Sequence, residues 1–523
     1  MSSSVFEASD SAARGNGLNG PIVEQHVLLA AKGGAITFVG KLFTFGCRLV
    51  ITFVLARALG AGQYGLYNLA LTALSVVAAV SAFGMDSTLV RYIPIFARRR
   101  DEARLWGVLQ IGLGLSTLLS LALSAALFAL AQPIAVEIFH QPRLAPLLRI
   151  ASLIVPVLTL SNMAASATRG FKTMRYATIA QDFFQPLIRL VLVIVLVVVG
   201  LNPARALATM GIGVAVGCVM LLYFLNNLFP LRRSPRTARH EPREIFGFSV
   251  PVFLSDLMMT FRDNIQTLML GALNSVANVG IFAVANQMNM FGSMFQSAIA
   301  TASRPIISEL YDQGEREQMG RMYQTTTKWS LTVNLPVFLI LVLFPTQILS
   351  LFGKSFVTGA TTLTLIACAI MVDVSTGMCG LILDMTGHTT LKLINNIVRL
   401  ALSVALSFLL IPAWGIVGAG LSVLIVVGVT NLLRLIQVFW LFRLLPYDRS
   451  FIKPLTAGGA ALGAALIVGY WSPGSADLLY AAFQSALLLA IYIGLILGLG
   501  LTSEDRVVLA HLRRRLSRKA RPR

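Results

Sequence analysis

The segment LGAGQYGLYNLA at residues 59–70 has a partial copy later in the chain, LGALNSVANVGIFAVA at residues 270–285. Both begin with Leu-Gly, continue after a short link with a Gly and an apolar pair, and reach an Ala three residues beyond that pair. Weak internal similarity over a long separation indicates that one structural unit occurs twice in the chain.

Four more matched pairs keep the same order along the sequence. They are RYIP (91–94) with SRPI (303–306), EIFHQP (137–142) with SLFGKS (350–355), TRGFKTMR (168–175) with MTGHTTLK (385–392), and IRL (188–190) with VRL (398–400). The separation between partners stays between 210 and 217 residues, which favours two copies of one unit over chance similarity between apolar segments.

The composition places both copies in a membrane. The chain is 56% apolar and 12% charged, whereas a soluble domain carries roughly 25% charged residues. A spanning helix needs about 20 mostly apolar residues, and fourteen segments of the sequence qualify, six in each copy and two after them. We therefore predict an all-α integral membrane protein whose two six-helix repeats enter the membrane in the same direction.

The basic residues predict the orientation. With fourteen spans, 31 of the 42 Lys and Arg residues lie on the side of the two termini and 4 lie on the other side. Because cytoplasmic loops carry an excess of Lys and Arg, we expect both termini to be cytoplasmic, in the cell (inner or plasma) membrane. This distribution explains most of the net charge of +20, so no nucleic-acid partner is needed.

The same boundaries divide the chain into six parts. We predict a disordered cytoplasmic tail (1–30), an N-lobe with spans 1–6 (31–231), a basic cytoplasmic linker (232–245), a C-lobe with spans 7–12 (246–441), spans 13 and 14 (442–501), and a basic cytoplasmic tail (502–523).

Three segments resemble a known family. RALGAGQYGLYNLALTALSVVAAVSAFGMDSTLVRYIP (57–94), RGF (169–171) and LFGKSF (351–356) are similar to Wzx-type polysaccharide-biosynthesis (oligosaccharide) flippases of the multidrug/oligosaccharidyl-lipid/polysaccharide exporter superfamily. The resemblance covers roughly residues 30–440. It implies a V-shaped, two-lobed helical bundle that moves an undecaprenyl- or dolichyl-diphosphate-linked glycan from the cytoplasmic to the outer leaflet, and it implies no catalytic residues.

Cations inside the predicted spans are candidate substrate-binding residues, because intramembrane charges usually face a bundle interior or an aqueous cavity. Lys41 and Arg48 are seven residues apart and share one helical face. Arg189 and Arg399 occupy equivalent positions of the two copies, and Arg262 lies in span seven. We predict that these five cations line one central cavity, where arginine would suit a diphosphate through bidentate contacts.

Two other arginines are interpreted as membrane anchors. Arg57 and Arg434 lie near the ends of their spans, where long basic side chains reach the interface.

Acidic residues leave the role of this region open. Asp256 and Asp263 share a face of span seven, and Asp373 lies in span ten. They are candidate ion-coupling residues for H+ or Na+, but pairing with an arginine to hold helices together, or contact with sugar hydroxyls, fits the pattern as well. We expect no cofactor and no metal site, since the spacing of the four cysteines matches none.

These observations favour a secondary transporter, a flippase with a polyprenyl-diphosphate-linked glycan as partner and glycan-assembly enzymes as neighbours. A drug/cation antiporter of the same superfamily needs an acidic cavity, and the three aspartates keep it open. A lipid II flippase needs a cationic cavity too. A membrane glycan polymerase or ligase is disfavoured because all loops between spans are short.

Overall fold

The computed structural model describes residues 21–229, 238–471 and 477–498, and all regular elements in these ranges are helical. The first half contains α2 (Pro21–Ala82), α3 (Met85–Arg98), α4 (Glu102–Pro133), α5 (Ala145–Gly170), α6 (Met174–Ala177), α7 (Gln185–Val199) and α8 (Pro203–Leu228). The second half contains α9 (Pro242–Leu273), α10 (Val276–Asp312), α11 (Arg316–Leu343), α12 (Pro345–Ser350), α13 (Ala360–Thr376), α14 (Cys379–Met385) and α15 (Thr389–Phe442). Two more helices, α16 (Ile452–Trp471) and α17 (Leu478–Gly498), follow.

The predicted membrane character is confirmed. Within the described ranges, eleven helices are long and apolar enough to cross a membrane. Two of them, α2 and α15, are each interrupted by a glycine with a left-handed backbone, Gly60 at φ 71° and Gly415 at φ 55°. Each interruption separates two apolar halves.

Helix starts follow from local chemistry. The side chains of Asp101, Asn202 and Ser275 accept hydrogen bonds from backbone N–H groups in the first turns of α4, α8 and α10, which satisfies donors that have no partner inside the helix. Helix α2 begins at Pro21, within the predicted tail of residues 1–30. The rest of that tail, most of the predicted basic linker and the C-terminal tail lie outside the described residues.

The backbone confirms the repeat. Residues with left-handed backbone recur at equivalent turns of the two halves, 213–215 residues apart: Arg100 with Gly314, His140 with Gly353, Lys172 with Gly387, and Gly200 with Gly415. Such φ values are uncommon outside glycine, so their recurrence shows that the same turns were built twice.

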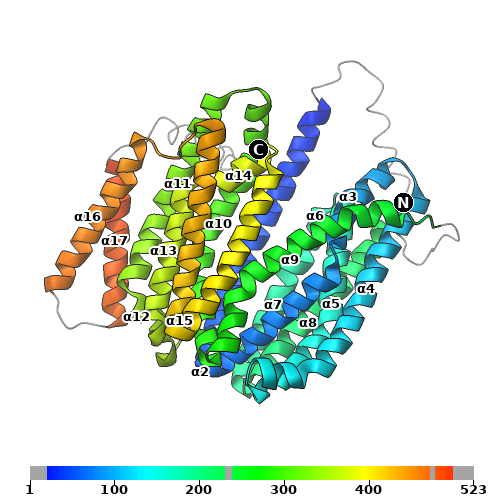
Figure 1. Ribbon diagram of the computed structural model, residues 1–523, viewed down its shortest axis with the longest axis horizontal. Helices are drawn as coiled ribbons and strands as arrows, with labels where there is room; N and C mark the ends of the chain where they lie inside the picture. Colours follow the sequence, from blue (N-terminus) through cyan, green and yellow to red (C-terminus); the bar gives the residue numbers. More distant parts are fainter. Residues whose placement is uncertain (1–20, 230–237, 472–476, 499–523) are drawn as a thin grey trace, which may run out of the picture.

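The two halves form two lobes of a V-shaped bundle (Figure 1). The lobes meet chiefly where α2 packs against α10, while α9 crosses from α3 to α15. The helices α7 and α15 do not pack along each other within the described chain. The pair α16 and α17 lies at the far edge of the C-lobe and packs on α11.

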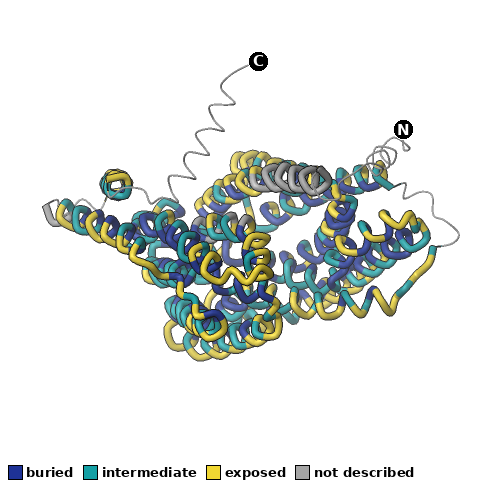
Figure 2. Tube along the Cα trace, turned by 90° about the horizontal axis from the view of Figure 1, so that it is seen from above, coloured by how far each residue is buried: buried dark blue, intermediate teal, exposed yellow. Residues whose placement is uncertain are grey.

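Buried residues concentrate between the helices and exposed ones on the outside (Figure 2). Large apolar side chains such as Val198, Trp440 and Leu479 are 87%, 76% and 84% exposed. This outward apolar surface fits helices that face lipid, where each backbone polar group is satisfied within its own helix.

Candidate substrate-binding site

Two arginines from different helices meet in the N-lobe. Arg48 lies in the first half of α2, within the electrostatic field of Arg189 on α7. Arg189 donates a hydrogen bond from Nη2 to the hydroxyl of Tyr67, and its guanidinium carbon lies 6.0 Å from the centre of the Tyr67 ring. Tyr67 is only 2% exposed. A fixed, buried side chain therefore holds the end of Arg189 near Arg48.

Glycines on α8 let α7 approach closely enough to form this site. A Cβ at Gly217 would lie 2.2 Å from the Gln185 side chain, and a Cβ at Gly213 would lie 3.0 Å from the Gln185 carbonyl oxygen. Gln185 is the first residue of α7, one turn before Arg189. The close packing of α7 on these two glycines thus sets the position from which Arg189 reaches Tyr67.

The positive charge of this arginine pair is not compensated by acids. Across the described ranges, no carboxylate forms an ion pair with Arg48 or Arg189. The groups that act on Arg48 are Arg189 and the two tyrosines Tyr64 and Tyr67. The Nε of Arg189 is buried and has no hydrogen-bond partner. Two like charges repel each other, so the pair is suited to an anion that bridges them.

The C-lobe holds a second group of charges in which acids balance the arginines. Arg399 on α15 lies in the electrostatic fields of Arg262 and Asp263 from α9 and of Asp373 from α13. The Nε of Arg262 lies 2.8 Å from Oδ1 of Asp263. Asn431 on α15 donates a hydrogen bond of 2.8 Å to Asp373. With Arg434, which also acts on Arg399, this group contains three arginines and two aspartates, so acids offset most of its positive charge.

Lys41 belongs to neither group. It lies with Arg169 in the electrostatic field of Asp182, and Thr44, one turn after Lys41, donates a 2.8 Å hydrogen bond to the Asp182 backbone carbonyl. Lys41 therefore faces an acid, in contrast to Arg48 seven residues later on the same helix.

Asp256 also stands apart, since it lies in the electrostatic field of Asp86 from the N-lobe. One carboxylate oxygen of Asp86 is buried without a hydrogen-bond partner. Two acids from different lobes thus lie near each other.

The structure divides the predicted site residues among four places. Arg48 and Arg189 meet in the N-lobe, Arg262, Asp263, Asp373 and Arg399 meet in the C-lobe, Lys41 lies beside Asp182, and Asp256 lies beside Asp86. That all five cations line one cavity stays a prediction.

The two predicted anchors also contact other parts of the bundle. Arg57 donates a 2.9 Å hydrogen bond to the backbone carbonyl of Leu351 in the other lobe. Arg434 lies in the electrostatic field around Arg399. Its guanidinium packs over Gly380, where a Cβ would lie 3.6 Å from Arg434 Nη1. Their role as membrane anchors stays a prediction.

Sequence reasoning missed Tyr67 and Asp182. Tyr67 lies inside the repeated segment at the position of Phe282 in the second copy. The hydroxyl, which is present in only one copy, could have indicated that Tyr67 has a polar partner. Asp182 follows Gln181 in a stretch that forms a wide helical turn, Thr178–Phe184, and only the fold brings it to Lys41.

The fold and the repeat define the class of this protein: a multi-pass, two-lobed membrane transporter built from parallel halves. The chain belongs to the family described as "Polysaccharide biosynthesis protein", whose sequence pattern matches residues 30–311. Residues 251–409 also match the family "MatE". The chain is therefore a member of the multidrug/oligosaccharidyl-lipid/polysaccharide exporter superfamily.

Named relatives point the same way. The chain is 22% identical over 511 residues to "Stage V sporulation protein B" of Bacillus subtilis, which covers 91% of this chain and 96% of that protein. It is 21% identical over 419 residues to "Probable low-salt glycan biosynthesis flippase Agl15" of Haloferax volcanii, covering 77% of this chain and 82% of that protein. It is 23% identical over 339 residues to "Succinoglycan biosynthesis transport protein ExoT" of Rhizobium meliloti, covering 63% and 64%.

Solved structures share the fold. The inward closed conformation of the lipid II flippase MurJ has a TM-score of 0.67 at 13% identity and covers 90% of this chain and 98% of that one. An inward-facing multidrug resistance MATE family transporter has a TM-score of 0.63 at 17% identity, covering 77% and 97%. These likenesses confirm the predicted fold.

Proposed function

We propose that this protein flips a lipid-diphosphate-linked oligosaccharide, or its repeat unit, from the cytoplasmic to the outer leaflet by alternating access. The diphosphate binds the Arg48–Arg189 pair, and the isoprenoid tail stays in lipid. No ATP is required, since a pre-existing ion gradient of H+ or Na+ drives the two lobes.

The uncompensated arginine pair carries this proposal. A diphosphate must be neutralised when it leaves water, and two guanidinium groups held close together supply the charge and the paired donors. An uncharged or cationic cargo gains nothing from such a pair. Relatives named for glycan biosynthesis support the same substrate class.

Orientation and lobe boundaries complete the proposal. Following the distribution of Lys and Arg, both termini and the basic linker at 232–245 face the cytoplasm. The N-lobe (31–231) supplies the anion site, and the C-lobe (246–441) supplies the acids for coupling. Residues 442–501 add two helices on the outside of the C-lobe.

Complementation tests the proposal. The gene is expressed in a host that lacks its own oligosaccharide flippase, together with Arg48→Ala and Arg189→Ala variants at matched membrane abundance. Arg149→Ala is the control, because Arg149 is exposed on α5 and lies over Phe128, 5.7 Å from the ring centre. We expect surface glycan with the native chain and the control, and loss with either variant. Full activity of both variants would reject the arginine pair as the substrate site.

One observation favours a drug/cation antiporter as the second candidate. The "MatE" match at residues 251–409 includes Asp256, Asp263 and Asp373. If the native chain restores no surface glycan but the purified protein moves a cationic dye, this second function replaces the first.

A further inference from the structure

The two lobes meet through a pair of glycines that face each other's backbone. A Cβ at Gly65 in α2 would lie 1.8 Å from the carbonyl oxygen of Val276, and a Cβ at Gly280 in α10 would lie 2.2 Å from the carbonyl oxygen of Ala61. Neither distance leaves room for any side chain. Each glycine thus exists at a point where a backbone from the other lobe fills the space that its side chain would need.

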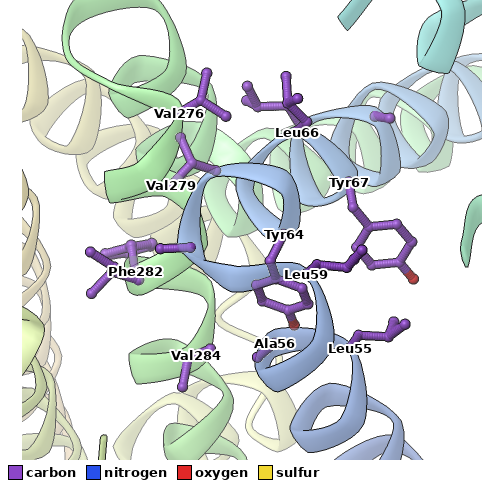
Figure 3. Close-up of a cluster of buried hydrophobic side chains, with 14 of the residues drawn as sticks. Leu55, Ala56, Leu59, Tyr64, Leu66, Tyr67, Val276, Val279, Phe282 and Val284 are labelled. Atoms are coloured by element: carbon purple, nitrogen blue, oxygen red, sulfur yellow. The ribbon is translucent and has the colours of Figure 1, made fainter. Parts of the chain in front are cut away.

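These contacts are reciprocal under the internal repeat. Gly65 and Gly280 are separated by 215 residues, and Ala61 and Val276 are separated by the same 215. When the first copy is superposed on the second, Gly65 falls on Gly280 and Ala61 falls on Val276. Each glycine therefore makes the same contact with the other lobe, as required at a two-fold axis between the lobes. Figure 3 shows Val276 and Val279 of α10 beside Leu66 and Tyr64 of α2 around this crossing.

Further cross-lobe contacts lie around the glycines at the same end of the bundle. Phe352 packs edge-on against Phe53 with ring centres 5.7 Å apart. Its counterpart in the other copy, Phe139, reaches the C-lobe at Gly271, where a Cβ would lie 3.1 Å from the ring. Arg57 adds a 2.9 Å hydrogen bond to the Leu351 carbonyl. Backbone, rings and a charged donor all join the lobes here.

From this arrangement we infer that the reciprocal contacts of Gly65 and Gly280 are the closing contact of a gate at the end of the bundle opposite the proposed cytoplasmic face. The inference rests on the alternating access in the proposed function. The structure is the state in which this gate is shut, and opening it separates α2 from α10. Because the contact is backbone against backbone, it closes without side-chain rearrangement and tolerates no Cβ.

The gate and the anion site share one tyrosine. Tyr64 precedes Gly65, lies in the electrostatic surroundings of Arg48, and packs against Phe356 of the C-lobe with ring centres 6.3 Å apart. Opening the gate removes Phe356 from Tyr64, so the surroundings of the arginine pair change when the lobes separate. This links release of an anion to the open state.

Reversible cross-linking tests the gate directly. Phe53→Cys and Phe352→Cys are introduced together after Cys47, Cys218, Cys368 and Cys379 have been replaced by Ala. In membranes treated with a mild oxidant, we expect a disulfide between the new cysteines, quantified by mass spectrometry of the linked peptides. Surface glycan in the complemented host should stop when the disulfide forms and return after reduction.

Glycine variants test the closing contact. Gly65→Ala and Gly280→Ala are combined with the cysteine pair, and Gly62→Ala is the matched control because a Cβ at Gly62 meets nothing within 4 Å. We expect roughly tenfold less disulfide at a fixed oxidation time in both gate variants, since overpacking a fitted contact disfavours the closed state. The control should match the parent. All variants are compared at equal abundance and equal monodispersity in detergent.

The outcomes separate this inference from the proposed function. Unchanged disulfide yield in both gate variants, or transport that continues while the lobes are cross-linked, overturns the gate. Cross-linking needs no glycan, so it still decides the gate if the protein moves a different cargo. Failure of complementation with normal cross-linking would reject the proposed substrate and leave the gate standing.

Discussion

Each lobe holds one arginine that other charged or polar groups surround, and the two surroundings differ. Arg189 in the N-lobe donates to the Tyr67 hydroxyl and lies beside a second cation, Arg48. Arg399 in the C-lobe lies among Arg262, Arg434, Asp263 and Asp373, so groups of both signs surround it. The backbone framework is shared, and the polar partners are not.

The difference lies in the surroundings of the two arginines, since the turns on either side of Arg189 recur 215 residues later and match it with Val404. An uncompensated pair attracts an anion, whereas a group of mixed charge holds helices together or exchanges a small cation for a proton. In the proposed function, substrate binding belongs to the N-lobe and ion coupling to the C-lobe. Four changes to the molecule test this division, beginning with the largest expected effect.

Removing both N-lobe arginines should abolish the function that we propose. For Arg48→Ala with Arg189→Ala we expect a loss of more than roughly 30-fold in flipping rate, because truncating the partner of a desolvated charge costs about 2–5 kcal/mol. The measurement is transfer of a fluorescent lipid-diphosphate glycan across proteoliposomes. The same double change at Arg262 and Arg399 should reduce the rate less, and an equal or larger loss there would place the substrate in the C-lobe.

Neutralising the C-lobe acid should affect coupling instead of binding. Asp373→Asn keeps the side-chain shape and loses the charge that Asn431 contacts. We expect roughly a tenfold lower gradient-driven rate, the size of one pKa unit of interaction energy, with unchanged apparent affinity for the lipid-linked glycan. Flipping is followed with and without imposed H+ and Na+ gradients. Asp384→Asn is the control, because Asp384 pairs with Lys392 at 2.9 Å. A rate that still responds to either gradient in Asp373→Asn argues against this role.

The sequence predicted the elements that depend on local composition. Span-length apolar segments, the turns at Gly60 and Gly415 and the order of the two copies follow from hydropathy, glycine and internal similarity. The repeated segment even contains both gate glycines, although their mutual contact could not be inferred. Two sequences can match without showing that their helices touch.

The site was harder to predict, since charges were known only by position along one helix. Lys41 and Arg48 share a helical face, yet they meet different partners because Asp182 and Arg189 come from a segment more than a hundred residues away. The proximity of Asp256 to Asp86 likewise depends on how α9 crosses the N-lobe. Helical phase gives the direction of a side chain, and only packing between helices gives its neighbour.

A subtler test of the arginine pair removes one oxygen atom. Tyr67→Phe keeps the buried ring and deletes the acceptor for Arg189. A hydrogen bond to a charged group contributes about 1.5–3 kcal/mol, so we expect roughly a tenfold higher KM for the lipid-linked glycan with little change in maximal rate or thermal stability. Tyr176→Phe, at a tyrosine stacked on Phe224, controls for loss of a hydroxyl elsewhere in the lobe. An unchanged KM would show that Arg189 keeps its position without Tyr67.

The smallest effect is expected at Lys41. Lys41→Gln removes a cation that lies near Asp182. Lys41 and Arg48 are both exposed, but only Lys41 has an acid beside it, and exposed ion pairs contribute about 0–1 kcal/mol. We therefore expect less than roughly a fivefold change in flipping rate, measured beside Arg48→Gln on the same helix, which should lose far more. The two substitutions delete the same charge seven residues apart, so any difference between them reflects their partners. If both reduce flipping equally, Lys41 also contacts the diphosphate, and the anion site extends along α2 past Asp182 instead of ending at the arginine pair.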